Sequence, residues 1–111
     1  MEILEQRQGA VTVLKPQGPL CGPDAEQFVH RVREVMGRSL GRFVVDCASI
    51  AWVDSRGLEV LKETTEQLSE GGQALRLCGC NETVREVLEL TDLASRFEHY
   101  QDVGSAVRSF L

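Results

Sequence analysis

The sequence lacks a long hydrophobic run, an excess of basic residues and an abundance of aromatic residues. Its longest unbroken apolar run is Ile50–Val53. A membrane-spanning helix needs about 20 apolar residues, so we expect no insertion into a membrane. Lys and Arg number 12 against 17 Asp and Glu, which gives a net charge of −5. Nucleic-acid binding requires a dense positive face, and aromatic residues are only 5% of the chain, so nucleic acid is not an expected partner.

Secretion signals are also missing from the sequence. The first residues after Met1 are acidic and include no apolar segment of the kind that directs export, so we expect a cytoplasmic protein. With 111 residues, of which 42% are hydrophobic, the chain suits a single domain over residues 1–111. A chain of this size buries roughly 65% of the surface that it exposes when unfolded.

The four cysteines do not have the pattern of a disulfide framework or a zinc site. Cys47 and Cys78 lie in apolar stretches, which predicts buried free thiols. Cys78-Gly79-Cys80 has no histidine or second cysteine pair nearby. Cys21 lies in a Pro- and Gly-rich segment and is the cysteine that we expect to be accessible. The sequence therefore predicts no metal and no cofactor.

Hydrophobic periodicity predicts an α/β fold in which strands and helices alternate. The first helix is expected to begin at Pro23, and the later helices are expected to be capped by Ser55 or Asp54, by Asn81 and by Asp102. The second helix is expected to bury Leu58, Leu61, Thr65 and Leu68. Gly37 and Gly41 are expected to end the first helix, and Lys15–Gly22 reads as a loop. Expected strands are Ile3–Gln6, turning at Gln8-Gly9 into Ala10–Leu14, then Arg42–Cys47, Ala74–Cys78 and Phe97–Tyr100. The order β-β-α-β-α-β-α-β-α predicts a small mixed, largely parallel sheet with crossover helices.

Signatures of catalysis are mostly absent. No nucleophile elbow, zinc-protease motif, P-loop or dinucleotide-binding motif occurs, and His30 and His99 are far apart in sequence. We therefore expect no enzyme, although a small enzyme or redox protein that uses Cys21 is an alternative. Ligands of open α/β sheets bind at the carboxyl ends of strands. Two loops are expected there, Pro16–Gly22 and Ala48–Asp54.

The segment Val44–Leu58 carries the most specific pattern in the chain. A strand ends in Asp, a short loop contains an aromatic residue, and the motif D-S-x-G-L opens a helix. The segment resembles the signature of STAS domains, the module of anti-sigma factor antagonists and of sulfate transporter tails. The order and length of the elements are similar over the whole chain. Six residues match the signature in order and spacing: Asp46, Trp52, Asp54, Ser55, Gly57 and Leu58.

The resemblance implies a binding module rather than an enzyme. In soluble members of the family, the serine that matches Ser55 is phosphorylated by a partner that is both anti-sigma factor and serine kinase. The unphosphorylated form binds this partner and releases the sigma factor, and phosphorylation ends the binding. The residues expected to contact the partner are Cys21, Trp52, Asp54, Ser55, Arg56, Gly57 and Leu58.

Two positions depart from the family pattern. Gly18-Pro19-Leu20-Cys21 stands where the family has a loop with two acidic residues, and Arg56 replaces a small residue. These departures indicate either a different kinase or a scaffold that is no longer phosphorylated. The alternative function is a STAS accessory subunit of a membrane transporter, such as a lipid ABC complex. Taken alone, Asp54-Ser55 is also explained as a helix cap.

Arg56 is expected to serve in contact with the partner rather than in stability. A cation in the first turn of a helix opposes the helix dipole. The sequence therefore predicts that Arg56→Ala keeps or raises thermal stability and weakens partner binding.

Overall fold

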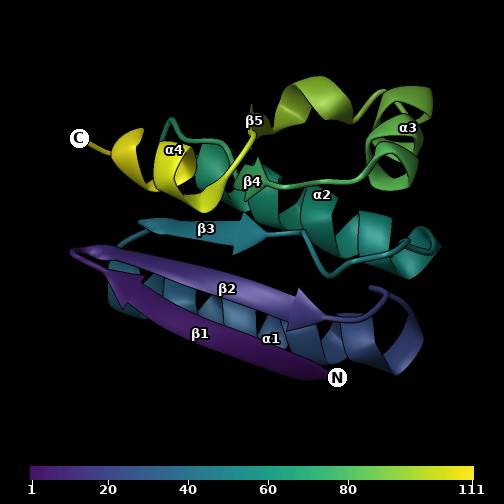
Figure 1. Ribbon diagram of the computed structural model, residues 1–111, viewed down its shortest axis with the longest axis horizontal. Helices are drawn as coiled ribbons and strands as arrows, with labels where there is room; N and C mark the ends of the chain where they lie inside the picture. Colours follow the sequence, from purple (N-terminus) through teal and green to yellow (C-terminus); the bar gives the residue numbers. More distant parts are fainter.

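A computed structural model describes all residues, 1–111, and shows a five-stranded sheet in the order β1-β2-β3-β4-β5 (Figure 1). β1 runs antiparallel to β2, and β2 to β5 are parallel. This mixed, largely parallel sheet confirms the predicted fold class. The strands are β1 (Glu2–Gln8), β2 (Val11–Gln17), β3 (Phe43–Asp46), β4 (Arg76–Cys78) and β5 (Glu98–Tyr100).

Helices cover the two faces of the sheet unequally. α1 and α2 lie behind the sheet in Figure 1, and α4 lies on the opposite face. The larger core lies between the sheet and helices α1 to α3 and includes Leu14, Phe28, Phe43, Leu61 and Leu88. The helices are α1 (Gly22–Ser39), α2 (Ser55–Ser69), α3 (Glu82–Leu90) and α4 (Val103–Arg108), with a short 3₁₀ helix, η1, over Ala94–Arg96. None of these helices is both long and apolar enough to cross a lipid bilayer.

α4 is fixed to its face of the sheet by apolar and polar contacts together. Ala106 packs into a small cluster with Val11, Val44 and Cys78. Arg76 of β4 donates from Nε to Ser109 Oγ at 2.7 Å, and its guanidinium lies 3.7 Å from the centre of the Phe110 ring. Hydrogen bonding and cation–π attraction therefore seat the end of the chain on β4.

α2 is held against the sheet by hydrogen bonds of Thr65 as well as by the packing of its leucines. Thr65 Oγ1 donates to Arg96 O at 2.7 Å and accepts from Leu75 N at 3.0 Å. Leu58, which was expected in the buried stripe, is only half-buried, whereas Leu61, Thr65 and Leu68 are buried as expected. The buried face also includes Gly57, Val60 and Thr64.

Several expected boundaries were wrong. β2 continues through Pro16 to Gln17, so the loop begins later than Lys15. Pro16 is tolerated because the pairing of β2 with β3 covers only residues 12–14, which leaves β2 with one neighbour at this point. The hairpin turn is Gly9-Ala10 rather than Gln8-Gly9, because Gln8 already pairs with Val11.

The ends of the other elements also differ from expectation: β1 extends beyond Ile3–Gln6 on both sides, and β3 leaves out Arg42 and Cys47. α1 passes through Gly37 and ends at Ser39, because one glycine weakens a helix by only about 1 kcal/mol. β4 and β5 keep only the last three residues of their expected ranges, and η1 was not expected. Short strands end where the ladder ends, and side-chain patterns mark such limits poorly.

Candidate functional site

The two loops expected at the carboxyl ends of the strands do meet. Gly18 N donates to Ser49 O at 3.0 Å, and Leu20 N donates to Trp52 O at 3.0 Å. Leu20 also forms a parallel bridge with Val53. These hydrogen bonds extend the pairing of β2 and β3 beyond the strands, so the loop after β2 and the loop after β3 form one surface.

Asp54 joins the amino ends of α1 and α2 at this surface. It is the N-cap of α2, and its Oδ1 accepts from Gly57 N at 2.8 Å. Its Oδ2 accepts from Gly22 N, the first residue of α1, at 3.0 Å. Hydrogen bonds from these backbone N–H groups hold the pKa of Asp54 below its ordinary value of 3.8, the Gly57 bond contributing most. The capping residue is therefore Asp54, and Ser55 is the first residue of the helix.

The two hydrogen bonds that Asp54 accepts, from Gly57 N and from Gly22 N, are called the Asp54 clasp. They predict that the stability of the fold depends on pH. Because its folded pKa lies below 3.8, the carboxylate stabilises the fold above that pH and loses this contribution as the pH falls through the lower, folded value. Asp54→Asn is expected to melt at a lower temperature at pH 7 and to show a smaller further loss below pH 3.8. Thermal melts across this pH range measure both effects.

Asp102 offers a matched control for the Asp54 clasp. It caps α4 through Ser105 N at 2.8 Å and also has a lowered pKa, but it holds one helix rather than two. Asp102→Asn is expected to leave the fluorescence of Trp52 unchanged, whereas Asp54→Asn changes it. If both variants change the fluorescence of Trp52 equally, Asp54 does not join the two helices in the way that the structure shows.

Ser55 and Trp52 are the exposed members of the predicted site. Ser55 is exposed, and its hydroxyl makes no hydrogen bond within the chain. Trp52 leaves 46% of its surface exposed, although it is the single largest apolar side chain available to the core. Cys21 is half-buried and precedes α1 as its N-cap, where its side chain makes no capping hydrogen bond. The clasp of Asp54 on Gly22 brings Cys21 to the amino end of α2.

Gly57 and Leu58 support the site from beneath it. Gly57 is buried, and a methyl group there would strike the carbonyl oxygen of Leu20 and lie 3.3 Å from Val53 Cβ. Leu58 is half-buried against the larger core. Only glycine lets α2 approach the Leu20 loop this closely, so these two predicted site residues shape the surface rather than project from it.

Arg56 is held by three carboxylates, which the sequence did not indicate. Its guanidinium pairs with Glu26 of α1 and, at 3.0 Å and 3.5 Å, with Glu59 and Glu63 of α2. The hydrogen bond from Arg56 lowers the pKa of Glu26, and the same bond raises that of Arg56. These pairs offset the unfavourable dipole interaction and bridge α1 to α2.

The ion pairs of Arg56 with the three glutamates change the expected effect of Arg56→Ala on thermal stability. Arg56→Ala is now expected to lower the melting temperature by a small amount that shrinks at high salt, because exposed ion pairs are weak and screened. Thermal melts at low and high ionic strength measure this difference. A melting temperature that is unchanged or raised at low salt would restore the earlier expectation that Arg56 has no part in stability.

Asn81 is a residue that sequence analysis saw only as a helix cap. Its Oδ1 accepts from Val84 N at 2.8 Å, as expected for a cap of α3. Its Nδ2 also donates to Ile50 O at 3.3 Å and Ala51 O at 3.1 Å. Asn81, which follows β4, thus holds the loop that carries Trp52 through these two hydrogen bonds. No sequence signal distinguishes this second role from the first.

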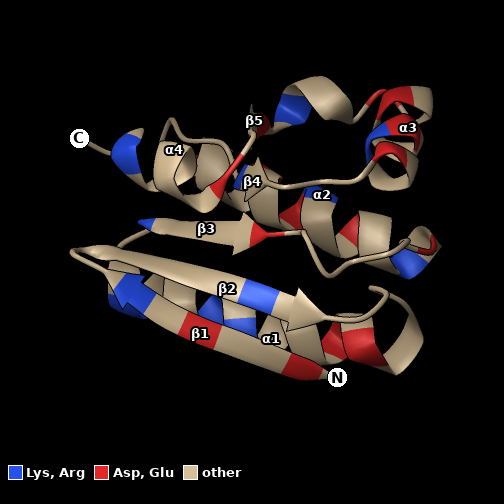
Figure 2. Cartoon of the chain, in the orientation of Figure 1, with Lys and Arg blue, Asp and Glu red and all other residues tan.

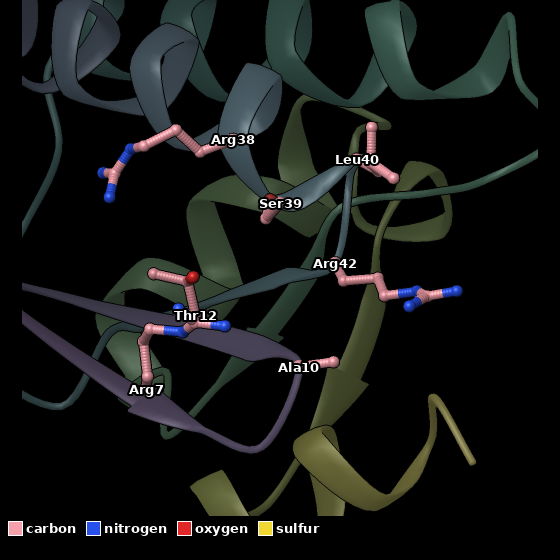
Figure 3. A pocket seen from close by; sticks show the side chains of 7 residues that line it. All are labelled: Arg7, Ala10, Thr12, Arg38, Ser39, Leu40 and Arg42. Atoms are coloured by element: carbon pink, nitrogen blue, oxygen red, sulfur yellow. The ribbon is translucent and has the colours of Figure 1, made fainter.

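The cavities of the molecule lie away from this surface. None of the four is lined by Cys21, Trp52 or Ser55. A cavity of about 250 Å³ opens at the other end of the sheet, beside Arg7, Arg38 and Arg42. In Figure 3, Arg38 and Arg42 extend in opposite directions, so the arginines do not converge on one point. Small molecules bind in concave sites, and none of these cavities opens at the Ser55 surface.

Charge is distributed unevenly between the two ends of the molecule. Figure 2 shows Asp and Glu gathered at the amino end of α1 and along α2 and α3, and basic residues at the hairpin end of β1. No group of three or more His, Cys, Asp or Glu side chains is arranged to hold a metal ion. The site therefore offers a hydroxyl, an indole ring and an acidic surrounding.

Comparison with known protein families gives a match that is consistent with this fold and this motif. The family model of the STAS domain matches residues 3–106. The chain belongs to the STAS domain family. A search of curated proteins by sequence finds no match.

Solved structures of STAS proteins share the fold at low sequence identity. A Thermotoga maritima protein assigned as an anti-sigma factor antagonist superposes with a TM-score of 0.87 at 23% identity, over 96% of this chain and 92% of that one. The Bacillus antagonist SpoIIAA is similar in its unphosphorylated form, with a TM-score of 0.76 at 15% identity over 98% and 96% of the chains, and its phosphorylated form gives 0.71 at 14% over 97% and 99%.

Part of a membrane transporter has the same fold. The murine solute carrier 26 anion transporter A9 gives a TM-score of 0.75 at 18% identity, over 94% of this chain and 18% of the transporter. The STAS fold thus occurs both as a separate chain and as part of a larger protein.

Proposed function

We propose that this STAS protein is a cytoplasmic anti-sigma factor antagonist. It binds an anti-sigma factor with serine kinase activity through the surface formed by Cys21, Trp52 and Ser55. Phosphorylation of Ser55 ends the binding. The observation that carries the proposal is the exposed Ser55 hydroxyl, free of any partner within the chain, at the first residue of α2 in the family motif.

The position of Ser55 explains why a phosphate acts on binding rather than on folding. A phosphoserine carries a charge of about −1.5 to −2 at neutral pH. At the amino end of a helix, free N–H groups and the helix dipole favour an anion. The modification is therefore compatible with the fold and changes mainly the surface that faces the partner. SpoIIAA, whose structure is similar, exists in a phosphorylated and an unphosphorylated form.

Trp52 provides an intrinsic reporter of this surface. It is the only tryptophan in the chain, lies three residues before Ser55 and is 46% exposed. Binding of the partner kinase is expected to bury the indole ring, which shifts its emission to shorter wavelength. A fluorescence titration with a tryptophan-free partner measures the change. An unchanged emission at saturation, with binding shown by sedimentation, would place the interface elsewhere.

The alternative is a STAS accessory subunit of a membrane transporter that is not phosphorylated. The likeness to the transporter domain favours it, as does the occupation of Arg56 by three carboxylates, which leaves it less free to contact a phosphate. The antagonist is the stronger candidate because neighbours that match over 92% and 96% of their own length are separate antagonist chains.

Capture of the partner from the native host separates the two proposals. The tagged protein, in unphosphorylated form, is expected to retain a histidine-kinase-like ATPase that transfers phosphate from ATP to Ser55. Ser55→Ala should retain the same partner and accept no phosphate. Capture of an ABC ATPase, with no phosphate transferred to Ser55, would overturn the antagonist proposal in favour of the transporter subunit.

A further inference from the structure

β1 forms one edge of the sheet and pairs only with β2, so its outer side is open (Figure 1). The strand has seven residues, and all of them except Ile3 and Gln8 are exposed. β5, at the other edge of the sheet, has only three residues. An open edge is a template for a further strand, and proteins commonly protect an edge by keeping its strand short. β5 has this protection, whereas β1 does not.

The hydrogen bonds of β2 show which backbone groups of β1 point outward. Thr12 N donates to Arg42 O at 3.0 Å, so Thr12 bonds toward β3. Because the bonding direction alternates along a strand, the odd-numbered residues of β2 bond toward β1, where they pair with the even-numbered residues. The backbone N–H and C=O groups of Ile3, Glu5 and Arg7 therefore point away from the sheet.

The side chains of β1 lie on two different faces of the sheet. Ile3 packs into the larger core, and Glu5 pairs with Arg31 and Arg38 of α1, so the odd-numbered side chains lie on the face that α1 covers. Leu4 lies on the opposite face, where α4 covers β3, β4 and β5. Leu4 leaves 46% of its surface exposed. The open edge thus carries a large apolar side chain that is half in solvent.

We propose that β1 pairs with β1 of a second copy of the chain, antiparallel and about a two-fold axis at Leu4. Such an axis stands perpendicular to the joined sheet, because it reverses the strand and keeps α1 on the same face in both copies. Residues that are opposite each other share a face, so both are odd-numbered or both are even-numbered. With Leu4 opposite Leu4 of the second copy, Ile3 is opposite Glu5, and Glu2 is opposite Gln6.

This register suits both the backbone and the side chains of the edge. Ile3 and Glu5 have outward-pointing backbone groups, and each Ile3–Glu5 pair exchanges two N–H···O bonds. Leu4 falls at a pair without backbone hydrogen bonds, where opposite side chains lie closest, so the two leucines cover each other. Among residues 2–6 no like charges are opposite each other, and Arg31 and Arg38 already offset the charge of Glu5.

The neighbouring registers are less favourable. Pairing over the full length of β1 sets Glu5 opposite Glu5, and like charges directly opposite each other destabilise a sheet. A register centred on Gln6 sets Glu5 opposite Arg7, but it leaves Leu4 opposite a glutamine and buries less apolar surface. A register centred on Ile3 pairs fewer residues of the strand. The register centred on Leu4 is therefore the one that we expect.

The distribution of charge supports the same arrangement. Figure 2 shows acidic residues at the amino end of α1 and basic residues at the hairpin end of β1. Arg7 makes no ion pair within its own chain. The register carries Arg7 beyond Glu2 of the second copy, so the basic end of each copy lies beside the acidic end of the other. None of the paired residues belongs to the Ser55 surface, so the pairing does not rest on the proposed function.

Sedimentation equilibrium of the full chain tests the proposal. The unmodified protein is expected to form a dimer in a concentration-dependent equilibrium. Leu4→Lys sets two like charges at the axis and removes the leucine pair, so it should weaken the dimer by about tenfold or more. Gln6→Lys is the matched control, because it adds the same charge at an exposed position of the same face but opposite Glu2 of the second copy. It should dimerise at least as tightly as the unmodified protein.

Three results of this experiment would overturn the proposal. The first is an unmodified protein that stays monomeric at every concentration. The second is an equal effect of both lysine variants, which would place any dimer interface elsewhere. The third is a dimer that Gln6→Lys weakens and Leu4→Lys does not, which would centre the pairing on Gln6. Circular dichroism shows that both variants are folded.

Disulfide cross-linking tests the register independently of the affinity. Leu4→Cys sets two thiols at directly opposite positions, a spacing that a disulfide spans. Mild oxidation should therefore link two copies through the tryptic peptide Met1–Arg7, which mass spectrometry identifies. Gln6→Cys is the control, because its two thiols lie roughly 13 Å apart along the strand and should not link. A link through Gln6→Cys, or none through Leu4→Cys, would contradict the pairing about Leu4.

Discussion

Gly57→Ala is expected to destabilise the protein by about 1–3 kcal/mol, the usual effect of overpacking. In an uncrowded helix, the same change would stabilise by about 1 kcal/mol. Crowding prevails here because the added methyl group meets a backbone carbonyl, that of Leu20, rather than a flexible side chain. The carbonyl is fixed by its hydrogen bond from Asp54 N at 3.2 Å, so relieving the contact breaks the pairing of the two loops.

Gly37→Ala is the control for this prediction. Gly37 lies in α1, is exposed, and a methyl group there has no atom within 4 Å. This variant is expected to gain about 0.5–1 kcal/mol of stability. Chemical denaturation of both variants gives the two free energies of unfolding. If Gly57→Ala raises the free energy of unfolding as Gly37→Ala does, α2 does not approach the Leu20 loop as closely as the structure shows.

Ser55→Asp is expected to weaken binding of the partner kinase by roughly a hundredfold or more, while it melts at or slightly above the temperature of the unmodified protein. A carboxylate in the first turn of α2 interacts favourably with the helix dipole. In the interface, the same charge must lose water or face like charges, which costs at least about 3 kcal/mol. Calorimetric titration and thermal melts measure the two effects separately.

Two further variants separate the position of the charge from its presence. Ser55→Ala should bind as tightly as the unmodified protein. Ser95→Asp adds the same charge at an exposed serine of η1, which precedes β5 and belongs to neither of the two loops of the site, and should also bind normally. If Ser55→Asp binds the partner as tightly as the unmodified protein, Ser55 is not a switch for binding and is only the first residue of a capped helix.

The fold could be predicted from the sequence because its main signals are local. Apolar periodicity, the caps Asn81 and Asp102, and the alternation of elements indicate a parallel sheet with crossover helices, and the structure confirms both caps. Strand limits were less predictable. Pro16 was assigned to a loop because a proline usually ends a strand, and only the absence of a second neighbour at that position explains its inclusion.

The site was predictable as a motif but not as a set of contacts. Asp54 and Ser55 could be placed at a helix start, since capping is a local property. The clasp of Asp54 on Gly22 and the pairing of Arg56 with Glu26 join residues 32 and 30 positions apart. Such contacts depend on how α1 packs beside α2. For this reason Arg56 was interpreted as unfavourable to stability, whereas the structure surrounds it with carboxylates.

Mapping the surface that the partner covers tests the central claim most directly. In a nuclear magnetic resonance titration with the anti-sigma kinase, the backbone amides of Cys21 and of residues 52–58 are expected to show the largest shifts. The amides of Arg7, Arg38 and Arg42, at the opposite end of the sheet, should remain unchanged. Shifts concentrated at those arginines, with residues 52–58 unaffected, would contradict the assignment of the Ser55 surface to the partner.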